Sequence, residues 1–355
     1  MKSKSPGPAI VLSLLLSAGC DIGYFGHLIA GQFETWGRLV PVDQAVGDPN
    51  LTETERARLA LARDVRTFGI ERIGLRADDS YTLFEPNGME PAAFVLVAAS
   101  KDSLTPFLWD FFFFGRYSTR PYFDETLARD DAQSMIDMGY DVFLGRAAGF
   151  STLGIFADPI RQSNLTTDDT ELAELILHEM THSTVFKLED GNFNEAMATF
   201  VGRAAAQAYF DERDGPDSPA AAAARERFAD KAVIDVYVNE IHATMHRYYT
   251  ESAARAEPPK QIVAARVAEF DLLRQRYVDE FEPLLIHPDR YDFNRDGIFN
   301  NAWIIAAVPY TGNLDAYQAV FDKVGGSYAD LLAVLNQAAQ MPDSIGFLRT
   351  FAESP

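Results

Sequence analysis

The segment DDTELAELILHEMTHSTVFKLEDGNFNE, residues 168–195, carries the strongest structural pattern in the chain. Asp168 is typical of a helix N-cap. The apolar residues Leu172, Leu175 and Ile176 recur at helical spacing, so they predict one apolar stripe along a helix. A short acidic turn with a glycine then leads into a second run of helical spacing. We therefore expect a helix, a turn and a second helix that runs back past the first.

The first of these helices carries the pattern HExxH, residues 178–182. His178 and His182 are four places apart, so they project about 40° apart from one helix face and can bind the same zinc ion. Glu179 lies about 100° further round, where it is free to take a proton from a zinc-bound water. The alternative is two histidines and a glutamate on a solvated helix face. The apolar flanks disfavour it, because a half-buried helix would leave these groups costly and unpaired.

A catalytic zinc site of this kind needs a third protein ligand, and Glu195 on the second helix is the candidate. A helix that ends near Leu188 and reverses through a short turn would bring Glu195 back toward His182. The competing interpretation is that Asn192 caps the second helix and Glu195 is only its capping-box partner. We favour the ligand interpretation and expect one zinc ion.

Composition excludes several classes of protein. The chain has 355 residues, of which 47% are hydrophobic, so it can bury a substantial core. Lys and Arg total 31 against 52 Asp and Glu, a formal charge of −21, which leaves no basic surface for a nucleic acid. The single cysteine allows no intrachain disulfide and no cysteine-based zinc site, so any metal chemistry must use histidine and carboxylates.

The N-terminus predicts export. Basic residues precede the apolar stretch Ala9–Ala18, which is too short to span a bilayer and has the length of a signal peptide. The small residues before Cys20 resemble a bacterial lipobox, in which that cysteine is lipidated. We therefore predict a signal over residues 1–19 and a lipid anchor at Cys20 on the exported side of a bacterial membrane. An ordinary cleaved signal or a buried cysteine are the alternatives.

The remaining pattern predicts an α+β fold, with a small mixed or antiparallel sheet in the first half and a helix-dominated second half. We expect one domain over residues 20–355, with an α+β part over 20–165 and a helical part over 166–355. The expected helices in the first half are Leu51–Thr67, with a Thr52 and Glu55 capping box, and Phe123–Met138; the expected strands are Ser80–Phe84, Ala93–Ala99 and Asp141–Gly145.

Beyond the metal-binding pattern, the sequence resembles the bacterial predicted aminopeptidases, which are envelope proteins of the gluzincin type. The residues that carry the resemblance are Gly31-Gln32, Ser80-Tyr81, Ala98–Trp109, Gly115–Tyr117, Tyr122–Asp124, Gly139–Val142, Phe150–Gly154, Asp158-Pro159, His178–His182, Phe193–Glu195, Asn300–Ala302 and Tyr310. The resemblance implies a zincin-like zinc peptidase with His178, His182 and Glu195 as ligands and Glu179 as base. It also implies a peptide substrate and a place in the cell envelope.

Two further segments are candidates for handling the substrate. Tyr310 lies in a Gly- and Pro-bounded region after Asn300–Ala302 that could fold over the cleft, so it is a candidate donor to the oxyanion; a core tyrosine is the alternative. We expect Phe150–Phe156 to form an extended edge strand beside the metal that pairs with peptide backbone.

Two other patterns are better explained structurally. His242 and His246 are also four apart, but no acidic base lies between them, so an accessory metal site is the minority interpretation. Asp292–Gly297 imitates half of a calcium-binding loop, yet Trp303 stands where the bidentate glutamate belongs, and a capped turn before a helix over Asn300–Val308 is favoured.

Two other functions stay open at the level of sequence. The chain could be a non-catalytic envelope lipoprotein that uses this fold as a scaffold, or a zinc hydrolase of a non-peptide amide. The oligomeric state and the choice between aminopeptidase and endopeptidase do not follow from the sequence.

Overall fold

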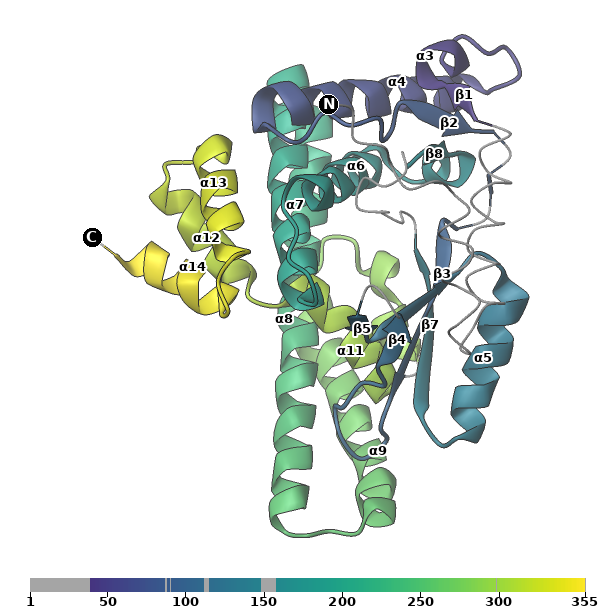
Figure 1. Ribbon diagram of the computed structural model, residues 1–355, viewed down its shortest axis with the longest axis vertical. Helices are drawn as coiled ribbons and strands as arrows, with labels where there is room; N and C mark the ends of the chain where they lie inside the picture. Colours follow the sequence, from purple (N-terminus) through teal and green to yellow (C-terminus); the bar gives the residue numbers. More distant parts are fainter. Residues whose placement is uncertain are drawn as a thin grey trace, which may run out of the picture. The chain divides into compact units, whose positions relative to one another are not determined.

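A computed structural model describes residues 39–355, except 87, 90, 112–114, 148–157, 298 and 355. Within the chain, Val40–Pro355 groups into one compact unit, and it is the unit described below. Its elements confirm the α+β class (Figure 1), because short strands occupy the first half and long helices the second.

The unit begins with a short strand and a well-capped helix. The helix α4 spans Glu53–Phe68, and its N-cap Thr52 forms the predicted capping box with Glu55. The helix α3 spans Val42–Ala45, and a π-helical turn over Gly69–Ile73 follows α4. A mixed sheet beside α4 joins β1 (Val40–Pro41) antiparallel to β2 (Leu83–Glu85) and β2 parallel to β8 (Ile160–Arg161).

The second sheet is antiparallel and has β3 (Ala93–Ala99) at its centre, between β6 (Thr119–Tyr122) and β7 (Asp141–Ala147). The apolar run of β3 is buried on both faces, because α5 (Glu125–Asp137) packs on one side and α11 (Asn301–Thr311) on the other. Figure 1 shows this sandwich. A separate hairpin joins β4 (Trp109–Phe111) to β5 (Gly115–Tyr117).

Helices form nearly all of the second half. Their bounds are α6 Asp169–Thr184, α7 Gly191–Asp214, α8 Pro219–Ala254, α9 Pro259–Arg276, α10 Phe293–Asp296, α11 Asn301–Thr311, α12 Leu314–Lys323, α13 Tyr328–Ala338 and α14 Ser344–Glu353. Short π and 3-10 turns lie at Gln162–Thr166, Tyr277–Phe281, Glu282–Leu284 and Pro288–Tyr291. The long helix α8 and its neighbour α9 run side by side as a hairpin in Figure 1.

Two apolar cores hold these helices. One joins α4, α6, α7 and the α12–α14 group, and the other joins α8, α9 and α11. Because α11 packs on α7 and α8 and also on β3, it connects the helical half with the sheet. None of the helices in the described ranges has the length and apolar character that a membrane crossing requires.

One expectation about the sheet is corrected. The first-half strands form three small sheets rather than one, because β2 pairs with β8 just before α6 and not with β3. The predicted strand Ser80–Phe84 is accordingly shorter and shifted, to Leu83–Glu85, whereas Ala93–Ala99 is found with its predicted bounds.

Candidate metal centre

The helix α6 presents the HExxH residues from a largely buried position. The Asp168 carboxylate accepts a hydrogen bond from Glu171 N at 2.9 Å and so caps the helix as predicted. The apolar side chains of α6 are buried against α4 and α7. His182 keeps only 7% of its surface exposed. The histidines therefore face a partly enclosed site rather than open solvent.

The turn after α6 differs from the sequence expectation in two ways. The helix ends at Thr184 rather than near Leu188, and the cap of α7 is Asp190, which accepts a hydrogen bond from Phe193 N at 3.1 Å. Asn192 is not the cap, so the capping-box alternative for Glu195 is not formed. The buried side chain of Asn194 accounts for the tight turn between α6 and α7.

Asn194 acts as a clamp on this turn. Its Oδ1 accepts from Lys187 N at 2.9 Å and its Nδ2 donates to Lys187 O at 2.7 Å. The pair of bonds mimics a backbone ladder, so the chain turns back early and α7 runs against α6. Sequence spacing does not predict this role, because an asparagine beside the candidate ligand carries no pattern that distinguishes a turn-stabilising residue from a surface residue.

A glycine lets the two helices approach closely at the site. A Cβ added at Gly202 on α7 would lie 3.2 Å from Glu174 O and 3.2 Å from both the N and the Cβ of His178. A larger residue there would press directly on the α6 backbone that carries the first histidine. The absence of a side chain at Gly202 thus allows the close spacing of α6 and α7 beside the candidate ligands.

The three candidate ligands converge on one point. His178 Nε2 lies 3.1 Å from His182 Nε2 and 3.3 Å from Glu195 Oε2, and His182 Nε2 lies 3.5 Å from Glu195 Oε2. Ligand atoms bound about 2.0–2.1 Å from a tetrahedral metal ion are about 3.3–3.4 Å apart. Among the described residues, these three form the group of histidine and acidic side chains that could hold a metal ion.

The electrostatics of the trio favour ionised Glu195. Burial opposes this charge, but hydrogen bonds from His178 and His182 outweigh it and hold the pKa of Glu195 well below its usual value. Burial would likewise lower the pKa of His182, yet the bond and charge of Glu195 raise it. A metal cation bound here would displace the histidine proton and take its place beside the carboxylate.

Glu179 lies on the same helix, outside this triangle, with two tyrosines near it. Burial raises the pKa of Tyr81 and of Tyr310 well above its usual value, and the negative charge of Glu179 adds to both shifts. Glu179 is half-buried. Its carboxylate therefore stands beside the candidate ligands, with two neutral hydroxyl groups within electrostatic reach.

Tyr310 reaches the site from the last turn of α11. Its ring stacks on the His178 ring, with centroids 6.2 Å apart and planes at 22°, and its hydroxyl contacts the Glu195 carboxylate. Nevertheless 45% of the residue is exposed. Tyr310 is thus not the core tyrosine of the alternative interpretation: one side of it lines the candidate centre and the other is open.

Tyr81 occupies a strained position. Its φ of 62° lies in the left-handed region, which is costly for a bulky side chain, by roughly 1–3 kcal/mol. A hydrogen bond from Tyr81 N to Asp158 O at 2.7 Å holds the backbone there, and Arg66 fixes Ser80 O at 2.8 Å. The sequence marks Tyr81 only as part of the resemblance, because no local pattern predicts positive φ at tyrosine.

Charged residues brace α6 from behind. Glu174, one turn before His178, faces Arg203 of α7, with Nε and Oε1 3.3 Å apart, and also pairs with Lys231 of α8. Arg203 in turn binds Asp235 of α8. All four side chains are largely buried, so the ion pairs tie α6 to both of its neighbours.

Other predicted features lie away from this centre or outside the described residues. The rings of His242 and His246 are 6.1 Å apart on α8 and belong to no described trio of metal-binding groups. Asp292–Gly297 forms the short helix α10 and a bend, whereas Asn300 caps α11 through Trp303 N at 2.9 Å. Cys20 and Phe150–Phe156 lie outside the described residues.

Comparison with known proteins gives one match. The family model described as "Putative aminopeptidase" matches residues 23–345, which is most of the chain. No curated protein and no solved structure matches it.

Proposed function

The chain belongs to the putative aminopeptidase family, and from this premise we propose that it is a zinc-dependent hydrolase of peptide bonds. The observation that carries the proposal is the triangle of His178, His182 and Glu195 atoms, with sides of 3.1, 3.3 and 3.5 Å. Two imidazoles and one carboxylate are the ligand set of catalytic zinc sites that keep a fourth position for water. The family supports peptide hydrolysis, and the donor set supports the metal.

The residues fit zinc in spacing and in chemistry. Nitrogen and carboxylate donors suit this ion, and the three donor atoms already lie at the mutual distances of a tetrahedral face. Zinc bound there supplies Lewis-acid polarisation of a carbonyl and makes water more acidic. The triangle is formed without rearrangement of α6 or α7, so little ordering is needed before the ion binds.

Glu179 is the proposed general base. It takes a proton from the attacking water as the new C–O bond forms, and it then passes that proton to the leaving amine nitrogen as the C–N bond breaks. Its place beside the trio, and not within it, leaves the carboxylate free for this transfer. The neighbouring tyrosines are neutral and do not compensate its charge.

Tyr310 is the proposed donor to the developing oxyanion. Its hydroxyl is protonated at neutral pH and donates to Glu195 in the structure, so turning from that carboxylate to the substrate would place the same donor on the oxyanion. Its open side lets a substrate approach, while stacking on His178 keeps the ring next to the centre. A donor of this kind contributes on the order of 10²- to 10³-fold to the rate.

The location is also part of the proposal. We infer from the lipobox-like residues before Cys20 that the enzyme is exported and anchored by lipid in a bacterial envelope, on the periplasmic side. The excess of acidic residues supports a surface that stays off anionic headgroups, so the lipid would provide the attachment.

The test combines metal content with cleavage of peptides that have free or acetylated N-termini. Glu179→Gln should retain stoichiometric zinc and lose activity by roughly 10²-fold or more. Glu195→Ala should lose zinc affinity, with activity partly restored by added zinc. Glu212→Gln, which removes an exposed carboxylate from the far end of α7, is the matched control and should change neither.

The substrate arms separate the competing functions. Cleavage only of peptides with a free N-terminus would establish an aminopeptidase. Cleavage of both free and acetylated peptides would establish an endopeptidase. Stoichiometric zinc without cleavage of any peptide would overturn the proposal and favour a scaffold or a hydrolase of another amide. If Glu195→Ala binds zinc as tightly as the native protein, the third ligand is a different residue.

A further inference from the structure

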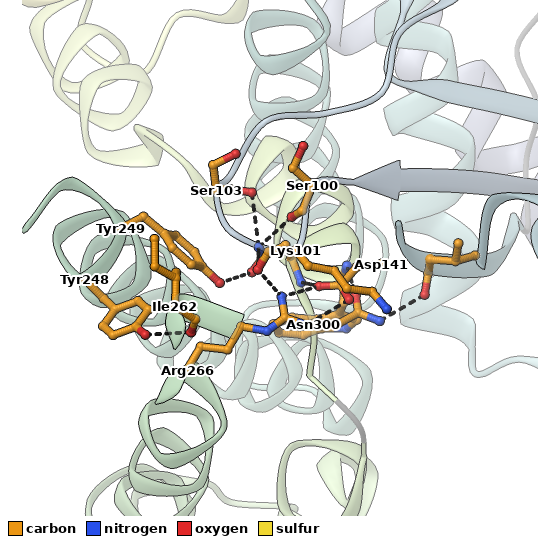
Figure 2. A network of polar contacts seen from close by, with 12 residues as sticks. Ser100, Lys101, Ser103, Asp141, Tyr248, Tyr249, Ile262, Arg266 and Asn300 are labelled. Atoms are coloured by element: carbon orange, nitrogen blue, oxygen red, sulfur yellow. Dashed lines mark hydrogen bonds and ion pairs between the residues drawn. The ribbon is translucent and has the colours of Figure 1, made fainter. Parts of the chain in front are cut away.

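We propose that Asn301 is a positioning residue for the reaction. The buried polar network around it fixes the position of α11, and through that helix it fixes the position of Tyr310 at the proposed metal centre. The inference rests on the proposed function, because the position of Tyr310 matters only if that centre is active. The network, shown in Figure 2, lies at the first residue of α11, and Tyr310 belongs to the last turn of the same helix.

Asn301 is fully buried and uses both ends of its amide. Its Nδ2 donates to Ser100 O at 2.8 Å and to Ser103 O at 3.1 Å, in the loop after β3. Its Oδ1 accepts from Tyr249 Oη of α8 at 2.8 Å. The first residue of α11 is therefore fixed to a loop and to a helix at the same time.

An ion pair completes the network. Asp141, at the start of β7, accepts from Asn301 N at 3.0 Å, and Arg266 of α9 binds both of its oxygens at 2.6 and 2.9 Å. Arg266 also donates to Lys101 O at 2.7 Å. Both charged side chains are at least nine-tenths buried. A buried ion pair is expensive to desolvate, so its contribution here is better explained by specificity of position than by stability.

The apolar contacts of α11 with the sheet would not fix its register alone. The fully buried members of the cluster between α11 and β3 are Val97, Ala99 and Ala302, and the partly buried side chains of Val95, Phe143, Ile305 and Ala306 pack against them. Apolar attraction of this kind is non-directional. Hydrogen bonds are directional and short, so the network supplies the missing restraint.

Displacement at Asn301 reaches Tyr310 because α11 is a single short helix. The two residues are nine positions apart, or about 13.5 Å along a helix axis. Asn239 of α8 also holds the far end, through Nδ2 to Thr311 O at 2.9 Å. Tyr310 is half exposed and its ring stacks on His178, so its position depends on the position of α11 as well as on that stacking.

Two adjacent tyrosines provide a matched pair of variants. Tyr249→Phe removes the bond to Asn301 of α11, whereas Tyr248→Phe removes a bond to a backbone carbonyl, Ile262 O at 2.7 Å, which joins α8 to α9. Asn301→Ala is the stronger perturbation. Each variant is combined with Tyr310→Phe in the full-length protein, and kcat, KM and zinc affinity by chelator competition are measured.

We expect Asn301→Ala to lower kcat by on the order of 10- to 100-fold with KM little changed, since small misplacement of a reacting group costs rate rather than binding. Tyr249→Phe should lower kcat less, and Tyr248→Phe by under about twofold. In the Tyr310→Phe background the further loss from Asn301→Ala or Tyr249→Phe should nearly vanish, because the network acts through that hydroxyl.

Additive losses in the double variants would overturn the inference, as would equal effects of Tyr249→Phe and Tyr248→Phe. If Asn301→Ala does not fold, the tyrosine pair still decides the question. If the native protein cleaves no peptide, the proposed function fails separately, and zinc affinity becomes the readout. Tyr310→Phe should then weaken zinc binding about 10-fold, as loss of a ligand's hydrogen-bond partner does, and Tyr249→Phe should weaken it only while Tyr310 is present.

Discussion

Replacing Gly202 by alanine should disturb the metal centre although Gly202 touches no substrate. The added Cβ would stand 3.2 Å from three atoms of α6, namely Glu174 O, His178 N and His178 Cβ. Contacts this close require the helices to separate by a few tenths of an ångström. Two of the three atoms are backbone atoms, so no side-chain rotation can relieve them.

Two opposing terms decide the effect on stability. Alanine is favoured over glycine inside a helix by about 1 kcal/mol, which would stabilise α7. Overpacking a tight interface costs about 1–3 kcal/mol. We expect a net loss of roughly 0–2 kcal/mol in the free energy of unfolding of the metal-free protein. The larger consequence should be for the metal.

The geometry of the ligand triangle explains why zinc binding should be affected more than stability. Its sides are 3.1–3.5 Å, and metal sites tolerate distance errors of about 0.2 Å. Moving His178 relative to Glu195 by a few tenths should therefore weaken zinc binding by on the order of 10-fold or more.

Zinc affinity by chelator competition and thermal unfolding without metal would measure the two effects. Gly191→Ala is the matched control, because it lies in the same helix and its added Cβ meets nothing within 4 Å. A Gly202→Ala variant that is about 1 kcal/mol more stable and binds zinc normally would refute the reasoning.

Four further outcomes are expected. Tyr81→Phe should lower activity by on the order of 10-fold while zinc content stays stoichiometric, since the lost hydroxyl lies near Glu179 and not among the ligands; normal turnover would contradict this. The raised pKa of His182 means that zinc must displace a proton, so zinc affinity should increase as pH rises through that pKa, above the usual 6.5. In the metal-free protein, the stabilisation from His182 is complete below about pH 6.5 and is lost as pH rises through the folded pKa of His182. The stabilisation from Glu195, whose pKa is lowered from 4.5, is present above about pH 4.5 and is lost as pH falls. Unfolding of the metal-free protein measured across this pH range would reveal both losses. Mass spectrometry of the N-terminal peptide should find lipid on Cys20 in protein made with its own signal, and an unmodified cysteine would contradict the anchor.

The helical part of the fold could be predicted because it depends on local signals. The helix α7 ends just before Gly215, whose φ of 90° suits glycine, and the Thr52 cap starts α4 at the expected place. The sheet could not be predicted to the same degree. Strand pairing is set by distant partners, such as β8 for β2, and no residue within β2 indicates that choice.

The same contrast holds for the site. His178, Glu179 and His182 share one helix, so helical periodicity alone places them. Placing Glu195 beside the histidines also requires the turn between the two helices to be predicted. The geometry of that turn depends on the hydrogen bonds of Asn194, which sequence spacing does not reveal. The partners Asp141 and Arg266 are 125 residues apart, and their pairing follows from tertiary packing that no local pattern encodes.

The spacing of these residues along the chain also sets an order of assembly during folding. His178 and Glu195 are 17 residues apart, whereas Asp141 and Asn301 must close a loop of 160 residues. By loop-closure entropy the longer closure costs about 2 kcal/mol more. On a nascent chain the α6–α7 hairpin is complete before α11 has been made. The hairpin alone brings His178, His182 and Glu195 together, so in the proposed enzyme the ligand set is formed before Tyr310 arrives and the oxyanion donor is added last.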